Sequence, residues 1–342
     1  MEQSTQLVIA KHKNPVAVYL KNNGGILIAL GLMLAIISVT SPYFWTGLNM
    51  KSLLMLITTT SLLGLGMTTL LITGYIDLSP GSTFAFAGVL LCKMIEHWGM
   101  NFYVALFATL LVSVLLGILM GGIIAYSGMP AFIVTLAMDG IKRGVAYLIS
   151  GSSLKIYSLN ESLKAFGNNN WFGIPIPAYI IVFCCILVAI ILSRTVTGRH
   201  LYATGGNQNA AINAGVNVKK TCMIAYAMMG FLAGLAGCIS AAKVSSGQPT
   251  AGTDIMSDAV AAAVLGGTAF SGGKGTVLGT MTGVILIGVA CNALNLLEVS
   301  YYWQMAFKGT LILAAVYIDT IKQHNEGKIK RLTPKKKVAH SA

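Results

Sequence analysis

Charge is scarce in this chain. Asp, Glu, Lys and Arg make up only 10% of the 342 residues, whereas soluble domains carry about 25%. Apolar residues reach 55%, and the mean hydropathy is +0.75. Glycine is abundant at 38 residues, as expected where transmembrane helices pack closely through small residues. The composition excludes an ordinary soluble domain and predicts an all-α polytopic membrane protein.

Acidic residues are the scarcest charged type, with 10 Asp and Glu against 23 Lys and Arg, for a net charge of +13. The basic residues sit in short clusters at the ends of apolar runs, with no interleaved aromatic residues on which bases could stack. This placement excludes a nucleic-acid partner and fits retention of positive charge on the cytoplasmic side of a membrane.

Residues for metal binding and catalysis are also few. The six cysteines lie in or beside apolar runs without metal-ligand spacing, and the five histidines lie in polar segments. A glycine turn at residues 271–275 invites comparison with a phosphate-binding loop. That loop needs an earlier glycine and a following Ser or Thr, where this chain has Thr268 and Gly275. We expect no metal, no cofactor, no bound nucleotide and no catalytic activity.

Ten apolar runs alternate with polar connections. If both termini lie on one side, 15 of the 23 Lys and Arg residues share that side and five lie opposite, which predicts cytoplasmic termini. Two runs, of 14 and 12 residues, are short enough to be re-entrant or broken helices, which predicts 8–10 spans. The expected organisation is a cytoplasmic arm (1–23), a transmembrane domain (24–321) and a basic cytoplasmic tail (322–342). The ten runs cover residues 24–40, 53–72, 82–95, 102–126, 131–150, 174–192, 223–242, 259–270, 276–297 and 305–321.

The longest polar island between two apolar runs, Thr197–Thr221, lies in a basic loop over residues 193–222. Its middle, Asn207–Ala214, is rich in alanine and long enough for about two helical turns. We expect Gly205-Gly206 to break the chain before this helix and Gly215 to end it. No acidic residue lies between Arg194 and Lys220. The island is either an ordinary loop with a helical turn or a cytoplasmic docking element.

Half of the acidic residues, five aspartates, lie in or beside apolar runs, where an ionisable group is a functional hypothesis. One of them could titrate during transport, as in a proton-coupled transporter. Alternatively, they could be structural. Asp139 lies three and four residues before Lys142 and Arg143, so it can pair with either base. The other four, Asp77, Asp254, Asp258 and Asp319, would then be interfacial cap or loop residues.

Two interrupted apolar segments begin near Asp77 and near Asp258. Short segments interrupted by Gly or Pro in corresponding parts of two halves often mark a translocation path. The candidate path residues are Asp77, Ser79, Gly81, Asp258, Gly266 and Gly267.

Several sequence blocks resemble the ribose-type sugar permeases of bacterial ATP-binding-cassette importers. The resemblance covers residues 25–321, and the sequence departs from the family pattern at Pro80, which concerns the geometry of the first broken helix. The blocks are Leu71–Ser82, Pro130–Leu136, Gly205–Gly215, Asp258–Thr268 with Ser271–Gly275, and Tyr302–Gln304 with Lys308-Gly309.

The resemblance implies a non-catalytic subunit in the bacterial inner membrane. Two copies, or one copy and a related permease, would form the pathway. ATPase subunits would dock on the cytoplasmic face, and a periplasmic or lipid-anchored binding protein would deliver a monosaccharide. The alternatives are a proton-coupled secondary transporter and a non-transporting scaffold. In such permeases a short coupling helix contacts the ATPase, which assigns that role to Gly205, Gly206, Asn207, Ala210, Ala211 and Gly215.

Overall fold

The computed structural model describes residues 15–151 and 155–332, and within these ranges the chain forms 13 helices and four strands of two residues. The helices are α1 (Pro15–Thr40), α2 (Gly47–Ile72), α3 (Pro80–Glu96), α4 (Phe102–Ser127), α5 (Ala131–Ile149), α6 (Glu161–Asn168), α7 (Ile176–Arg194), α8 (Val196–Gly206), α9 (Gln208–Asn213), α10 (Val218–Val244), α11 (Ile255–Leu265), α12 (Val277–Leu296) and α13 (Tyr301–Leu332).

Each of the ten apolar runs lies on a separate helix, which confirms the helical, multi-pass class of the chain. Five helices (α2, α4, α7, α10 and α12) are long and apolar enough to cross a membrane, and α11 and residues 24–40 of α1 are shorter apolar helices. The outer helices extend beyond the apolar runs. Helix α1 begins at Pro15, inside the expected arm, and α13 continues to Leu332, inside the expected tail. The remaining arm and tail residues lie outside the described ranges.

Polar side chains start many of these helices. Thr46, Asn101, Asn217 and Thr276 each accept a hydrogen bond from a backbone amide in the first turn, which satisfies a group that has no partner within the helix. Pro80 occupies the first turn of α3, where its missing amide hydrogen costs no hydrogen bond. The departure from the family pattern at this position is therefore compatible with a regular helix start.

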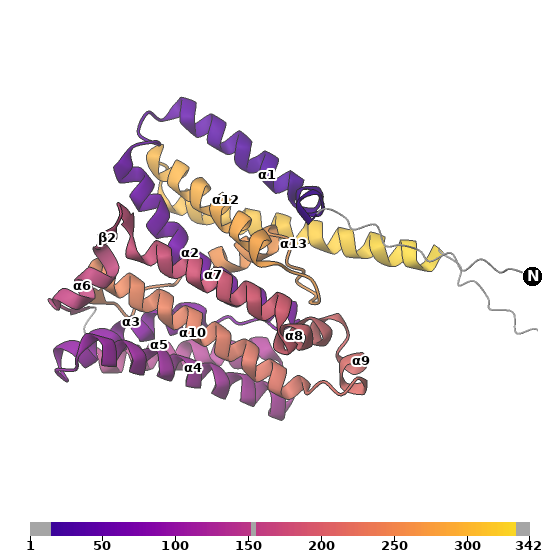
Figure 1. The fold of residues 1–342 in the computed structure, drawn as a ribbon, viewed down its shortest axis with the longest axis horizontal. Helices are drawn as coiled ribbons and strands as arrows, with labels where there is room; N and C mark the ends of the chain where they lie inside the picture. The colour runs from indigo at the N-terminus through magenta and orange to yellow at the C-terminus, as the bar shows by residue number, and fades with distance from the viewer. Residues whose placement is uncertain (1–14, 152–154, 333–342) are drawn as a thin grey trace, which may run out of the picture.

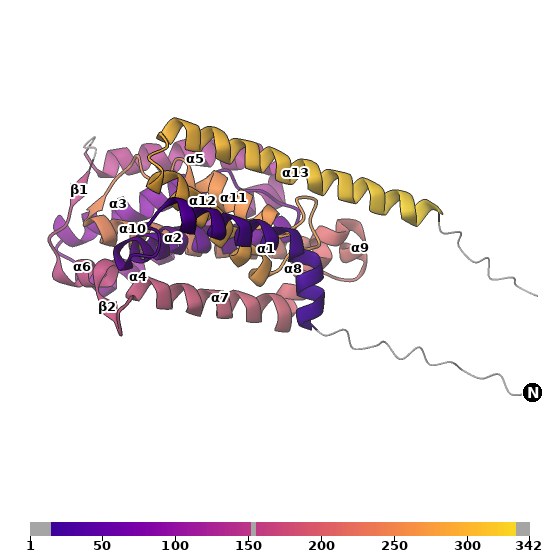
Figure 2. The ribbon, with the colours of Figure 1, turned by 90° about the horizontal axis from the view of Figure 1, so that it is seen from above.

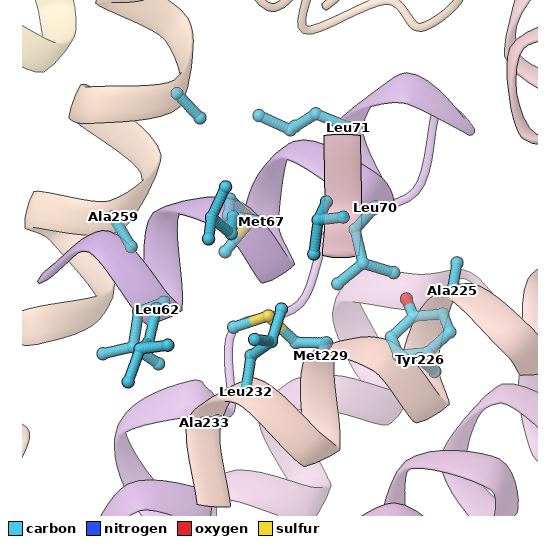
Figure 3. Packing of buried hydrophobic residues seen from close by; sticks show 14 of the residues in the cluster. Leu62, Met67, Leu70, Leu71, Ala225, Tyr226, Met229, Leu232, Ala233 and Ala259 are labelled. Atoms are coloured by element: carbon cyan, nitrogen blue, oxygen red, sulfur yellow. The ribbon is translucent and has the colours of Figure 1, made fainter. Parts of the chain in front are cut away.

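The core is formed mainly by α2 and α10, with α4, α3 and α11 packed around them. Figure 3 shows Leu62 and Leu70 of α2 on the side that faces Tyr226, Met229 and Leu232 of α10, and all five side chains are buried. Glycines let the helices approach closely, since a Cβ on Gly117 would overlap the backbone of α10 at Tyr226. Small residues at the contacts therefore allow the central helices to pack closely against the apolar helices around them.

The two ends of the helix bundle differ. One end carries α6 and the hairpin of β2 (Asn170–Trp171) and β3 (Ile174–Pro175). The other end carries α8 and α9 together with the start of α1 and the end of α13 (Figures 1 and 2). Strand β1 (Ile156–Tyr157) pairs with β4 (Ser246–Gly247), which ties the connection after α5 to the connection after α10.

Candidate functional site

The expected docking element consists of two short helices, α8 and α9, which we call the docking segment. The expected break at Gly205-Gly206 is wrong by one residue, because α8 continues through both glycines and the chain turns at Asn207, with φ −164° and ψ 107°. The Asn207 side chain accepts a hydrogen bond from the amide of Ala210 at 3.0 Å and so caps α9. Gly215, with φ +82°, follows the helix as expected. Helix α9 is therefore six residues long.

The two alanines of α9 have different surroundings. Ala210 is exposed, but Ala211 is 4% exposed and packs against its own chain, so only Ala210 is open to a partner. Ile212 projects from the same short helix with 53% exposure. Basic residues flank α9 in the sequence: Arg199 and Lys220 are exposed, and Lys219 places its ammonium 4.6 Å from the ring centre of Tyr126. The surface is thus basic with a small apolar projection.

Glycine contacts tie the docking segment to two distant parts of the chain. Gly205 lies against the carbonyl group of Ile72, the last residue of α2, so closely that a Cβ would overlap it. The same carbonyl accepts a hydrogen bond of 2.8 Å from the amide of Gly273, in the loop between α11 and α12. Tyr202 of α8 donates a 2.7 Å hydrogen bond to the carbonyl oxygen of Gly275. Burial raises the pKa of Tyr202, so its hydroxyl stays protonated as a donor.

The first interrupted segment joins α2 to α3 and contains Asp77 and Ser79. Asp77 is 1% exposed, and its Oδ1 accepts hydrogen bonds from the amide and the hydroxyl of Ser79, at 2.7 and 2.6 Å. Lys142 of α5 is 3% exposed and donates to the Ser79 hydroxyl at 2.6 Å. The Ser79 hydroxyl therefore connects a buried carboxylate to a buried ammonium group.

Of the two bases expected as possible partners of Asp139, the structure pairs Arg143 with it. Lys142 lies on the buried face of α5, with positions 134, 138 and 146, and it donates its hydrogen bonds to Ser79 and Thr83. Arg143 has its Nε 4.0 Å from Asp139 Oδ2, in a partly exposed pair. Such a pair contributes little stability. The stronger contacts of Arg143 are hydrogen bonds to the carbonyl oxygens of Pro249 and Ala251, at 2.8 and 3.2 Å.

The second expected segment begins near Asp258, in α11. We use the name second interrupted segment for the connection just before it, residues 245–254, which joins α10 to α11 and meets the first segment. Gly81, in the first turn of α3, lies against Gly252, which has φ +79°. A Cβ on Gly252 would be 2.8 Å from the carbonyl oxygen of Gly81. The structure therefore brings Asp77, Ser79 and Gly81 together, and it adds Lys142 and Arg143 to the same region.

The other three candidate path residues are not gathered there. Asp258, in the first turn of α11, is 2.9 Å from the Nζ of Lys308 on α13. Gly266 and Gly267 lie beyond the opposite end of α11, where Gly266 packs against Gly279 of α12. Sequence reasoning missed the Asp258–Lys308 pair because nothing in a separation of 50 residues links the two positions. Within the described ranges, no three His, Cys, Asp or Glu side chains converge on one point.

Comparison with known proteins agrees with a multi-pass membrane transport protein. Residues 49–316 match the family described as "Branched-chain amino acid transport system / permease component". The chain belongs to this permease family.

Three curated relatives show which members are similar. Over 303 residues, the chain is 40% identical to the ribose import permease protein RbsC of Escherichia coli K12, covering 87% of this chain and 93% of that protein. It is 36% identical over 300 residues to the L-arabinose transport system permease protein AraH (87% and 90%) and 33% identical over 298 residues to the D-allose transport system permease protein AlsC (87% and 91%), both also from Escherichia coli K12. No solved structure matches the chain.

Proposed function

We propose that this chain is the permease subunit of a bacterial ATP-binding-cassette importer that carries a ribose-like monosaccharide across the cytoplasmic membrane. The 40% identity to a ribose import permease over 87% of the chain carries this proposal. The family description refers to amino acids, but the arabinose and allose permeases also match over 87% of the chain. Their common substrate class is the monosaccharide.

The docking segment is proposed to receive the movement of partner ATPase subunits. Its support is the short capped helix α9, which exposes Ala210 and Ile212 and is flanked in the sequence by the exposed basic residues Arg199 and Lys220. Movement of α9 would pass through Gly205 to the end of α2 and to the loop after α11. ATP would drive alternating access if its binding favoured one state by several kcal/mol, about 5.5 kcal/mol for a full population switch. Gly206, Asn207, Ala211 and Gly215 shape the segment.

The orientation follows from the distribution of charge. The docking segment, the start of α1 and the end of α13 lie at the same end of the bundle (Figures 1 and 2). In the sequence, 15 of the 23 Lys and Arg residues belong to the arm, the 193–222 loop, the 271–275 turn and the tail. We infer that this end is cytoplasmic. The opposite end, with α6 and the β2–β3 hairpin, would face a periplasmic sugar-binding protein. The expected arm, transmembrane domain and tail keep their boundaries at residues 23 and 322 in this proposal.

The pathway is proposed to follow the two interrupted segments, beside a second permease copy or a related chain. Asp77, Ser79 and Gly81 contribute the first segment, and Asp258, Gly266 and Gly267 lie on or after the short helix that follows the second. Interrupted helices often place substrate at their ends near the middle of the membrane. Helices α3 and α11, with 17 and 11 residues, are short enough for this role. The ten apolar helices then give 8–10 spans, depending on how far these two extend.

Purification of the full chain from membranes in mild detergent, followed by ribose uptake in proteoliposomes, tests the function. We expect an ATPase to co-purify and Ile212→Asp to remove it, since the substitution puts a carboxylate on the exposed side chain of α9. Leu159→Asp is the matched control, because Leu159 is 76% exposed and lies two residues before α6, the helix at the opposite end of the bundle (Figure 1). Uptake by the isolated chain driven by a proton gradient would refute the proposal and favour a secondary transporter.

A further inference from the structure

Two adjacent basic residues of α5 each hold a different interrupted segment. Lys142 holds the first one. Its ammonium group has three hydrogens, and the structure gives it three acceptors on α3 and the residue before it: the carbonyl oxygen of Ser79 at 3.2 Å, the Ser79 hydroxyl at 2.6 Å and the Thr83 hydroxyl at 2.6 Å. Lys142 therefore ties α5 to the start of α3.

The side chain of Arg143 binds backbone carbonyl groups of the second segment. Its Nη1 donates to the carbonyl oxygens of Pro249 and Ala251, which belong to non-helical chain. Carbonyl groups without a partner are costly in a membrane protein away from water, and a guanidinium group offers several donors in a fixed plane. One side chain from α5 thus satisfies two carbonyl groups of residues 245–254.

The two held segments touch each other beside a small cavity. Gly81 and Gly252 are in backbone contact, and no side chain fits between them. The cavity has a volume of about 110 Å³, and its wall includes Ser240, Ser246 and Gln248. Ala251, one of the two carbonyl partners of Arg143, also lines it. A cavity with three polar residues in its wall therefore lies beside the place where the two interrupted segments meet.

We propose that Lys142 and Arg143 form a clamp that keeps the translocation path closed at the Gly81–Gly252 contact. This inference rests on the proposed sugar-import function. Both are positioning residues: they fix the two segments to α5, so the loss of either attachment lets one segment move away from the other. The partial exposure of Arg143 and Asp139, with side chains 19% and 31% exposed, supports a watery or protein-covered face here, because ionisable groups in membrane helices avoid lipid.

The test measures ATP-independent passage of sugar through the complete importer. Proteoliposomes containing the permease with its co-purified partners are loaded with radiolabelled D-ribose, and efflux is followed without ATP. We expect Arg143→Gln to raise efflux about tenfold or more, because loss of hydrogen bonds to a charged group shifts a two-state equilibrium by at least that factor. Arg143→Lys keeps the charge but not the fork of donors, so an intermediate leak is expected.

Tyr147→Phe is the matched control, since it removes a hydroxyl from the same helix one turn beyond Arg143. A merely structural role would lower import and ATPase activity together without a leak. Native efflux with native import in Arg143→Gln would overturn the clamp. If that variant does not accumulate, native efflux in Arg143→Lys would overturn it. Failure of the proposed function is recognised separately, because the unaltered importer would then take up no ribose.

Discussion

Gly205 and Gly206 are adjacent in α8 but differ in what surrounds them. A Cβ on Gly205 would overlap the carbonyl oxygen of Ile72 and lie 2.7 Å from the amide nitrogen of Gly273, whereas a Cβ on Gly206 would meet nothing within 4 Å. Alanine at the two positions therefore makes the same chemical change with opposite structural consequences. We expect Gly205→Ala to uncouple the importer and Gly206→Ala to leave it intact.

The magnitude follows from the groups that must move. Inserting a methyl group into a packed site costs about 1–3 kcal/mol. Displacing Ile72 or Gly273 also weakens the hydrogen bond between them, which contributes about 0.5–1.5 kcal/mol. The total is about 1.5–4.5 kcal/mol, or a change of about tenfold or more in the population of the docked arrangement. Alanine is the better helix former by about 1 kcal/mol, so Gly206→Ala should be neutral or slightly stabilising.

The assay compares ribose imported per ATP hydrolysed in proteoliposomes with equal amounts of permease. For Gly205→Ala we expect this ratio to fall by at least about tenfold, with ATPase subunits still bound through α9. Gly206→Ala should retain the native ratio. Equal ratios for the two variants would refute the reasoning, because they would show that the contact between α8 and α2 does not transmit movement.

Three further substitutions test other contacts. Lys142→Met should destabilise the chain by about 3–5 kcal/mol, because it leaves the carboxylate of Asp77 buried without its cation. In a double-mutant cycle, Asp77→Asn in the same chain should restore part of the thermal stability in detergent. Strictly additive losses of stability would contradict the link between the two residues. Asn207→Ala should remove the cap of α9 and destabilise that helix by about 1 kcal/mol. We expect a several-fold loss of coupled uptake, which Asn207→Asp should not show. Lys308→Met should speed hydrogen exchange in α13, whereas Lys308→Arg should not, since Asp258 then keeps a cationic partner; unchanged exchange in both would show that the pair does not fasten α13 to α11.

Hydropathy was sufficient to predict the ten helices that carry the apolar runs, because each run is long enough to indicate an apolar helix. It was less informative about helix ends. Helix α8 runs through Gly205-Gly206 because the backbone of Ile72 and Gly273 packs against that turn, and this tertiary contact outweighs the weak helix preference of glycine. Local sequence contains no record of such a contact.

The candidate site shows the same limit at the level of side chains. The spacing of Asp139 from Lys142 and Arg143 predicts a pair with either base, and the structure pairs Asp139 with Arg143. Position 142 falls on the buried stripe of α5 with Val134, Met138 and Ala146, and a lysine on such a stripe predicts a buried partner. The identity of that partner was not predictable. The carbonyl groups that bind Arg143 were even harder to predict, because every residue has a backbone carbonyl group.

The carbonyl group of Ile72 has a kinetic consequence. It belongs to the first half of the chain, it accepts a hydrogen bond from Gly273 in the second half, and Gly205 packs on it from the docking segment. A displacement of α8 cannot reach one half without also reaching the other. The inward-to-outward transition should therefore be a single concerted step within each subunit, without a populated intermediate in which only one half has moved.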